Sequence, residues 1–161
     1  MHWVHETIDC VQQAYDCIDA FGASGRVKDT WLRAGFQAIG FDIKLSPDHD
    51  LTSETGFKAL VKMGLKLKQE GILICAPPYS LFGPACSSIH RRTRDNPAGD
   101  QSNFKVRLAQ RIWKSFAVAV GMITDMRPDL FVVIEQPSGS WAFKQDFMLT
   151  LIAGLQLLPG W

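Results

Sequence analysis

The chain has 161 residues, of which 47% are hydrophobic and 20% are charged, an ordinary balance for a globular domain. Its formal net charge of +1 gives no overall reason to expect a nucleic-acid or membrane partner, so any such partner has to be recognised through local charge. We expect one domain over residues 1–161, with a core over about 17–157. No apolar run reaches the roughly 20 residues that span a bilayer, which predicts no transmembrane segment.

The four cysteines, at positions 10, 17, 75 and 86, include no CxxC pair, so the sequence predicts no metal site. They are too few for a disulfide scaffold, and we expect reduced thiols in a reducing intracellular compartment. The first residues, Met1 to Glu6, lack the basic or Arg- and Ser-rich composition of a leader. Cytoplasm or nucleus is therefore expected, with an organelle as the alternative if a transit peptide has been removed.

Segments with helical spacing alternate with short β-branched and aromatic runs along the chain. Helices are predicted over about Val4–Ala14, Val27–Ala34, Thr55–Gln69, Phe104–Met126 and Ala142–Leu157. Strands are predicted over Cys17–Phe21, Phe36–Ile43, Ile72–Ala76 and Leu130–Glu135, with a long loop from Tyr79 to about Ser102. This alternation predicts an α/β fold with a mostly parallel, doubly wound sheet. In such a sheet ligands bind beyond the carboxyl ends of the strands, and the polar and Gly- or Pro-rich motifs of this chain fall there.

A glycine-rich turn, Asp19 to Gly25, follows the first predicted strand. Glycines at this point let a ligand approach the backbone, and the next helix offers free N–H groups. Asp42 ends the second strand, where an acid accepts hydrogen bonds from ribose hydroxyls in nucleoside-binding α/β folds. Together the two features favour a nucleoside-containing ligand over their alternatives, a structural turn and a solvated carboxylate.

Two further motifs end the third and fourth strands, Ala76-Pro77-Pro78-Tyr79-Ser80-Leu81-Phe82 and Glu135-Gln136-Pro137. Glu135 closes a buried-looking strand without a local counter-ion, which favours a site role over an ordinary strand-end carboxylate. The stretch from His90 to Lys114 carries seven basic side chains against two aspartates. Beside the Pro-Pro motif, such a stretch predicts contact with a phosphate backbone, with a solvated loop as the alternative.

In this order and at this spacing, the motifs resemble those of class I S-adenosylmethionine (SAM) dependent methyltransferases, closest to the DNA cytosine-5 type. The first motif of that type reads D-L-F-x-G-x-G, and this chain matches it at Asp19, Phe21 and Gly25, with Ala23 in place of the first glycine. The resemblance implies a Rossmann-like sheet of the SAM-methyltransferase type without its C-terminal strand pair, and SAM as the cofactor. It assigns SAM contacts to Asp19, Phe21, Gly22, Ser24, Gly25, Asp42, Asp50 and Pro77.

The third motif of the cytosine-5 type reads P-P-C-Q-x-F, and its cysteine attacks C6 of cytosine. Pro77, Pro78 and Phe82 match, but Tyr79 stands in place of the nucleophile. A phenol has a pKa of about 10 and does not replace a thiolate without strong activation. Cys86 is the alternative nucleophile, disfavoured because covalent attack tolerates little misplacement. The resemblance also implies that Glu135 hydrogen-bonds the base, because the family has its E-N-V or E-N-P motif there.

The same residues also resemble the D/N/S-P-P-Y/F/W motif of methyltransferases that modify adenine N6 or cytosine N4. In that alignment Tyr79 stacks on a flipped base, while Ala76 lacks the side-chain acceptor for the amino group. Either alignment makes Tyr79 and Glu135 the residues of the catalytic site. Substrate contacts are then implied for Pro78, Ser80, Phe82, Arg91 and Arg92.

We therefore expect a SAM-dependent methyltransferase-like domain related to DNA base methyltransferases, with reduced catalytic equipment and with nucleic acid as the partner of the basic stretch. The alternative is a non-catalytic structural or interaction subunit of a larger, for example organellar, assembly with a protein partner. Tyr79, Ala76 and Ala23 favour this alternative, because each replaces a group that the family uses.

Overall fold

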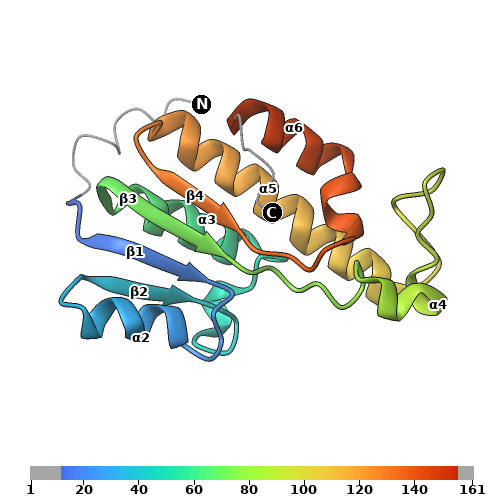
Figure 1. Cartoon of the computed structure of the whole chain (residues 1–161), viewed down its shortest axis with the longest axis horizontal. Helices are drawn as coiled ribbons and strands as arrows, with labels where there is room; N and C mark the ends of the chain where they lie inside the picture. Colours follow the sequence, from blue (N-terminus) through green and yellow to red (C-terminus); the bar gives the residue numbers. More distant parts are fainter. Residues whose placement is uncertain (1–11, 156–161) are drawn as a thin grey trace.

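The computed structural model describes residues 12–155, in which strands and helices alternate (Figure 1). The strands are β1 (Tyr15–Ala20), β2 (Ala38–Phe41), β3 (Leu67–Cys75) and β4 (Phe131–Ile134). The helices of the described part are α2 (Arg26–Arg33), α3 (Glu54–Leu65), α4 (Ser87–His90), α5 (Phe104–Met126) and α6 (Asp146–Leu155). Short 3-10 turns occupy Pro47–His49, Pro84–Cys86 and Trp141–Lys144.

The four strands form one sheet in the order β2-β1-β3-β4, and every pair is parallel. The chain passes from β1 to β2 on one side and then crosses to β3 on the other side of β1. The topological switch point of the sheet therefore lies between β1 and β3. The predicted α/β fold with a parallel sheet is confirmed, and its arrangement is Rossmann-like.

The hydrophobic core fills the space between the sheet and a layer made of α3, α5 and α6. Strand residues such as Ile18 and Leu73 are fully buried there, together with Leu60 of α3 and Phe116 of α5. Helix α5 lies in the middle of this layer and contacts both α3 and α6. In Figure 1, α3 passes behind the strands and α5 runs along β4.

The opposite face of the sheet is covered in the described part by α2, which contacts β1 and β2. Asp19 accepts a hydrogen bond from the backbone N–H of Lys28 in α2, which fixes the face to which Asp19 points. The paired residues on the same face are Ile72 with Phe131 and Ile74 with Val133. Phe131 is 59% exposed and Val133 is 46% exposed, and we call these four side chains of β3 and β4 the open face.

Helix α5 has the predicted bounds, Phe104–Met126. It begins after Asn103, whose side chain accepts a hydrogen bond from the N–H of Lys105, and it ends just before Pro128. The strand predicted over Leu130–Glu135 forms as β4. The predicted strand over Phe36–Ile43 is shorter, Ala38–Phe41.

The helix predicted over Thr55–Gln69 is wrong in its last part, because α3 ends at Leu65 and β3 begins at Leu67. The carbonyls of Leu65 and Leu67 accept hydrogen bonds from the buried guanidinium of Arg127, at 3.3 and 2.8 Å. The Lys66 carbonyl accepts from the N–H of Ala14 at 2.8 Å. These tertiary bonds satisfy carbonyls that a longer helix would have paired internally.

The helix predicted over Ala142–Leu157 is divided into a 3-10 turn and α6. Gln145 lies at the break, and its buried side-chain amide donates to the carbonyls of Pro97 and Trp141. The predicted loop from Tyr79 to Ser102 contains the short α4. Of the helix predicted over Val4–Ala14, positions 4–11 lie outside the described residues, and positions 12–14 are not helical.

Candidate functional site

The loops that follow the four strands emerge along one edge of the sheet. The strand ends are in register, with Ala20 level with both Phe41 and Cys75, and Cys75 level with Ile134. Backbone hydrogen bonds continue one residue further, since Phe21 donates to Phe41, Ala76 to Ala20 and Glu135 to Cys75. We call this row of loop starts the carboxyl edge. The motifs after β1 and β3 flank the switch point, where a crevice for ligands opens in sheets of this kind.

The turn after β1 is built around the carboxylate of Asp19, which is 2% exposed. Asp19 Oδ2 accepts a hydrogen bond from the N–H of Lys28 in the first turn of α2, at 3.1 Å. The backbone of Gly22 lies directly on this carboxylate, and a β-carbon at that position would overlap its oxygens. Asp19 therefore fixes the turn from inside and does not face the carboxyl edge.

Phe21 has a positive φ of 66°, a conformation in which a side chain with a β-carbon is strained. Its ring is held edge-on by Phe41 and Phe116, with centroid separations of 6.4 and 5.6 Å. Gly25 also has a positive φ, 67°, and its N–H donates to the Gly22 carbonyl. Backbone strain of this kind concentrates at ligand-binding turns, and here packing maintains it. Ser24 lies exposed at the tip of the turn.

The two predicted cofactor-binding acids of the β2 loop take part in local structure. Asp42 is 8% exposed, and its Oδ1 accepts a hydrogen bond from the N–H of Lys44 at 2.8 Å. No described residue donates to its second oxygen, Oδ2. Asp50 Oδ1 accepts from the N–H and the hydroxyl of Thr52, both at 2.8 Å. Asp42 therefore retains an acceptor for a ligand hydroxyl, whereas one oxygen of Asp50 already stabilises the turn before α3.

The Pro-Pro segment after β3 is clamped by two side chains from distant parts of the chain. The Pro77 carbonyl accepts a hydrogen bond from Gln136 Nε2 at 2.7 Å, and the Pro78 carbonyl accepts one from Trp113 Nε1 at 2.8 Å. Beyond this clamp the chain turns outward, and the side chain of Tyr79 is 56% exposed. Ser80 is exposed as well. Tyr79 thus presents an aromatic ring from a fixed backbone.

The structure places two of the predicted substrate residues in the interior. Phe82 is fully buried, with its ring 5.3 Å from that of Trp113 and 3.9 Å from the guanidinium carbon of Arg92. Arg92 is 4% exposed and donates to the carbonyls of Leu81, Pro97 and Ala98. Burial lowers the pKa of its guanidinium to about 10, and Nη2 bonds no described residue. Both residues organise the loop beneath its surface.

The rest of the basic stretch is largely exposed. The Arg91 side chain is 74% exposed and lies 3.9 Å from Asp100. Arg107 and Arg111 are exposed too, but their guanidinium groups donate to backbone carbonyls of Gln101 and Thr52. Of the predicted substrate contacts, Pro78, Ser80 and Arg91 therefore reach solvent, and the other two do not.

Glu135 begins the loop after β4 and is exposed. Its N–H donates to the Cys75 carbonyl, while no described residue donates a hydrogen bond to its carboxylate. The thiol next to the Pro-Pro segment, Cys75, is fully buried, and this burial raises its pKa. Cys86 is partly exposed, but it lies beyond the Tyr79 turn, in the 3-10 turn before α4. The carboxyl edge therefore offers an aromatic ring and a free carboxylate, without an activated thiol.

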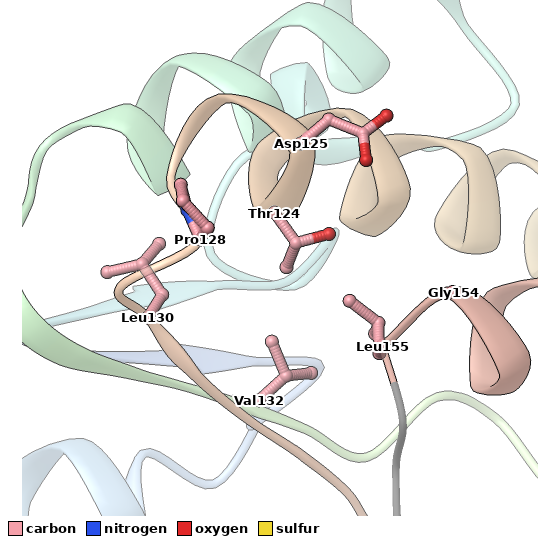
Figure 2. Close-up of a pocket in the computed structure, with 7 residues that line it drawn as sticks. All are labelled: Thr124, Asp125, Pro128, Leu130, Val132, Gly154 and Leu155. Atoms are coloured by element: carbon pink, nitrogen blue, oxygen red, sulfur yellow. The ribbon is translucent and has the colours of Figure 1, made fainter.

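A cavity of about 390 Å³ lies away from this edge, where α5 ends and β4 begins (Figure 2). It is bordered by residues of α5, of the turn between α5 and β4, of β4 and of α6: Thr124, Asp125, Pro128, Leu130, Val132, Gly154 and Leu155. None of the predicted site residues borders it. No group of three His, Cys, Asp or Glu side chains that would hold a metal ion occurs in residues 12–155. Within the same range, no helix is long and apolar enough to cross a membrane.

The fold defines an α/β protein with a parallel, Rossmann-like sheet, and the carboxyl edge at its switch point is the candidate site. Comparison with known proteins adds no closer assignment, since no family model, no curated protein and no solved structure matches the chain. What the chain binds has to be inferred from its own residues.

Proposed function

We propose that the chain is a SAM-dependent methyltransferase-like domain related to DNA base methyltransferases. The observation that carries the proposal is the group that follows each strand at the carboxyl edge, taken in chain order. The strained glycine-rich turn follows β1, Asp42 follows β2, the Pro-Pro-Tyr segment follows β3 and Glu135 follows β4. This is the order in which the resembled family presents its cofactor turn, ribose acid, base pocket and base-binding glutamate.

The cofactor is proposed to lie over the turn from Phe21 to Gly25. This turn has a strained backbone, with positive φ angles at Phe21 and Gly25, and the packing of Phe21 against Phe41 and Phe116 maintains it. The free Oδ2 of Asp42 accepts from a ribose hydroxyl, a bond that is strong because the acceptor is charged. Pro77 forms the opposite wall at the switch point, held by its hydrogen bond from Gln136.

The base is proposed to stack on Tyr79 with Glu135 as its hydrogen-bond acceptor. The exposed ring of Tyr79 and the unpaired carboxylate of Glu135 suit these roles. The exposed Arg91 and its basic neighbours supply contacts to phosphates, so nucleic acid is the proposed partner. Arg92 contributes to this only through the shape of the loop, because its side chain is buried.

Methyl transfer is weakly supported by the groups present. Attack on cytosine C6 needs a thiolate, and Cys75 is buried with a raised pKa. Transfer to an exocyclic nitrogen needs acceptors for the amino group, and Ala76 has none in its side chain. The Pro77 carbonyl already accepts from Gln136, which leaves it one lone pair. The proposal is therefore a domain that binds cofactor and base, with reduced capacity for transfer.

Calorimetric titration of the full chain with SAM tests the cofactor site. We expect binding, and we expect Asp42→Asn to weaken it by about 10- to 100-fold, because a hydrogen bond to a charged group contributes about 1.5–3 kcal/mol. Asp48→Asn is the matched control, since Asp48 lies exposed in the same loop. If no heat of binding is observed at high micromolar SAM, the proposal is refuted. If Asp42→Asn and Asp48→Asn bind SAM with equal affinity, Asp42 does not contact the cofactor.

A second candidate is a non-catalytic structural or interaction subunit that retains this fold. The missing thiolate at Tyr79 and the missing acceptor at Ala76 favour it. Transfer of a labelled methyl group from SAM to DNA or RNA separates the two candidates once SAM binding is known. Size-exclusion chromatography with light scattering adds a second criterion. A stable SAM-binding monomer that methylates nucleic acid excludes the structural candidate, and insolubility without a partner supports it.

A further inference from the structure

The outer side of α5 carries a row of exposed side chains that lies apart from the carboxyl edge. At about 100° per residue, three apolar and three basic side chains, all exposed, fall within an arc of about 120° around the helix. We call this row the α5 stripe, and its members are Phe104, Arg107, Leu108, Arg111, Lys114 and Val118. The α5 stripe is about 21 Å long, since the helix rises 1.5 Å per residue.

The α5 stripe points away from the Pro-Pro segment. Trp113, which donates a hydrogen bond to the Pro78 carbonyl, lies about 180° from Phe104 around the helix. The buried residues of α5, such as Phe116 and Val120, lie on the Trp113 side and belong to the core. A ligand bound at the carboxyl edge therefore does not explain the residues on the outer side of the helix.

The apolar members of the α5 stripe are strongly exposed. Phe104 is 66% exposed, Leu108 is 36% exposed and Val118 is 48% exposed. Phe104 and Leu108 are neighbours on the helix surface, because they are four residues apart. Single exposed apolar residues are common on proteins, whereas several that are aligned on one surface mark a contact site.

The basic members of the α5 stripe are not neutralised by acids. The sequence has no Asp or Glu from Phe104 to Thr124. In the part of the chain that the structure describes, no carboxylate pairs with Arg107, Arg111 or Lys114. Arg107 and Arg111 donate to backbone carbonyls, and these bonds leave their positive charges in place. Because charges more than about 10 Å away are screened by salt, the small net charge of the chain does not cancel this local field.

The combination of residues favours an anionic lipid surface over a nucleic acid. Nucleic acids are bound by cations at their phosphates and by aromatic rings that stack on their bases. The aliphatic side chains of Leu108 and Val118 do neither. The boundary between headgroups and acyl chains of a bilayer takes up aliphatic and aromatic side chains alike, and anionic headgroups attract the Lys and Arg side chains beside them.

We propose that the α5 stripe is a docking surface for a membrane that contains anionic lipids. Its three apolar side chains enter the boundary between headgroups and acyl chains, and its three cations remain among the headgroups. The helix then lies flat on the bilayer surface. The inference does not rest on the proposed function, because the α5 stripe and the Pro-Pro segment lie on different sides of α5.

Flotation of the full chain with lipid vesicles tests the proposal. Vesicles of phosphatidylcholine alone are compared with vesicles in which about one third of the lipid is phosphatidylserine. We expect binding to the anionic vesicles to be tighter on the order of 100-fold, because each of three cations near such a surface contributes roughly a factor of five. High salt should abolish most of this preference, since it screens the attraction.

Two pairs of variants locate the contact. Lys114→Gln should weaken binding to anionic vesicles about fivefold, whereas Arg26→Gln removes an exposed cation from α2, on the opposite face of the sheet, and should not. Phe104→Ser should weaken binding roughly tenfold through the loss of buried apolar area. Phe131→Ser removes a phenylalanine of similar exposure from the open face and should leave binding unchanged.

Three outcomes overturn the proposal. The first is a failure of the unmodified chain to bind anionic vesicles more tightly than neutral ones. The second is equal affinity of the test variant and its control in either pair, which means that another surface meets the membrane. The third is binding to an oligonucleotide that Lys114→Gln weakens, without binding to vesicles, which makes the α5 stripe a nucleic-acid surface. All four substituted positions are exposed, and circular dichroism checks that the variants fold. These measurements use no SAM, so their failure leaves the proposed function standing.

Discussion

Replacement of Gly22 by alanine places a methyl group where the Asp19 carboxylate lies. Asp19 is 2% exposed and has no room to rotate away without breaking its hydrogen bond with the Lys28 N–H, which measures 3.1 Å. Loss of a bond to a charged acceptor costs about 1.5–3 kcal/mol. Forcing a methyl group into a packed site costs about 1–3 kcal/mol more. We therefore expect Gly22→Ala to destabilise the protein by about 3–5 kcal/mol.

For a chain of this length, such a loss lowers the melting temperature by on the order of 10 °C, measured by calorimetry or circular dichroism. Gly83→Ala is the matched control, because a β-carbon there meets its nearest atom, the Tyr79 carbonyl oxygen, at 3.5 Å. Asp19→Ala alone should cost about 1.5–3 kcal/mol, because the Lys28 N–H in the first turn of α2 loses its charged acceptor. In the double variant the added methyl group finds the space that the carboxylate has left. The effects should therefore not add, and additive losses would refute the explanation.

Two further results are expected. The pKa of Asp129 is lowered because its carboxylate accepts hydrogen bonds from Arg127, at 2.9 and 2.7 Å. The stabilisation that this pair gives the fold is fully present above the unfolded pKa of about 4, and it is lost as the pH falls through the lower folded pKa. Urea unfolding at pH 5 and pH 3 should show a smaller loss of stability for Asp129→Asn than for the unmodified protein, and equal losses would contradict the pairing. In a Cys10→Ser variant, a thiol reagent at pH 8 should modify Cys86 in the folded protein, but Cys17 and Cys75 only after unfolding. Both of these thiols are fully buried, and burial raises the pKa of Cys17 to about 12. Mass spectrometry counts the modified sites, and rapid modification of more than one would show that the sheet opens.

The elements with strong local signals could be predicted from sequence. Helix α5 has a long apolar stripe, a capping Asn103 at its start and Pro128 just after its end, and its bounds were predicted correctly. The boundary between α3 and β3 could not be predicted in this way. It depends on Arg127, about 60 positions away, whose guanidinium binds the carbonyls of Leu65 and Leu67. The spacing of apolar residues within a segment does not indicate a hydrogen bond to a side chain so far away in the sequence.

The location of the candidate site at the carboxyl edge could be predicted, because a polar or a Gly- or Pro-rich motif follows each predicted strand. The orientation of the side chains within it could not. Phe82 and Arg92 belong to motifs that suggest exposure, yet each is buried against the other. Trp113 carried no signal for its contact with Pro78, because it lies in the middle of a helix, 35 positions away. Gln136 has no sequence signal of its own beside Glu135, although its side chain donates a hydrogen bond to the Pro77 carbonyl.

The two loops that flank the switch point of the sheet differ in how firmly they are anchored. The segment from Leu67 to Pro78, which contains β3, is attached at both ends to α5 and the residue after it, through Trp113 at the Pro78 carbonyl and through Arg127 at the Leu67 carbonyl. These two anchor points lie about 21 Å apart along the helix. The turn after β1 is held by one buried carboxylate, by local backbone hydrogen bonds and by the packing of a strained phenylalanine. The Pro-Pro side is therefore the more firmly anchored of the two, and we expect the turn after β1 to be the one that adjusts when the proposed cofactor binds.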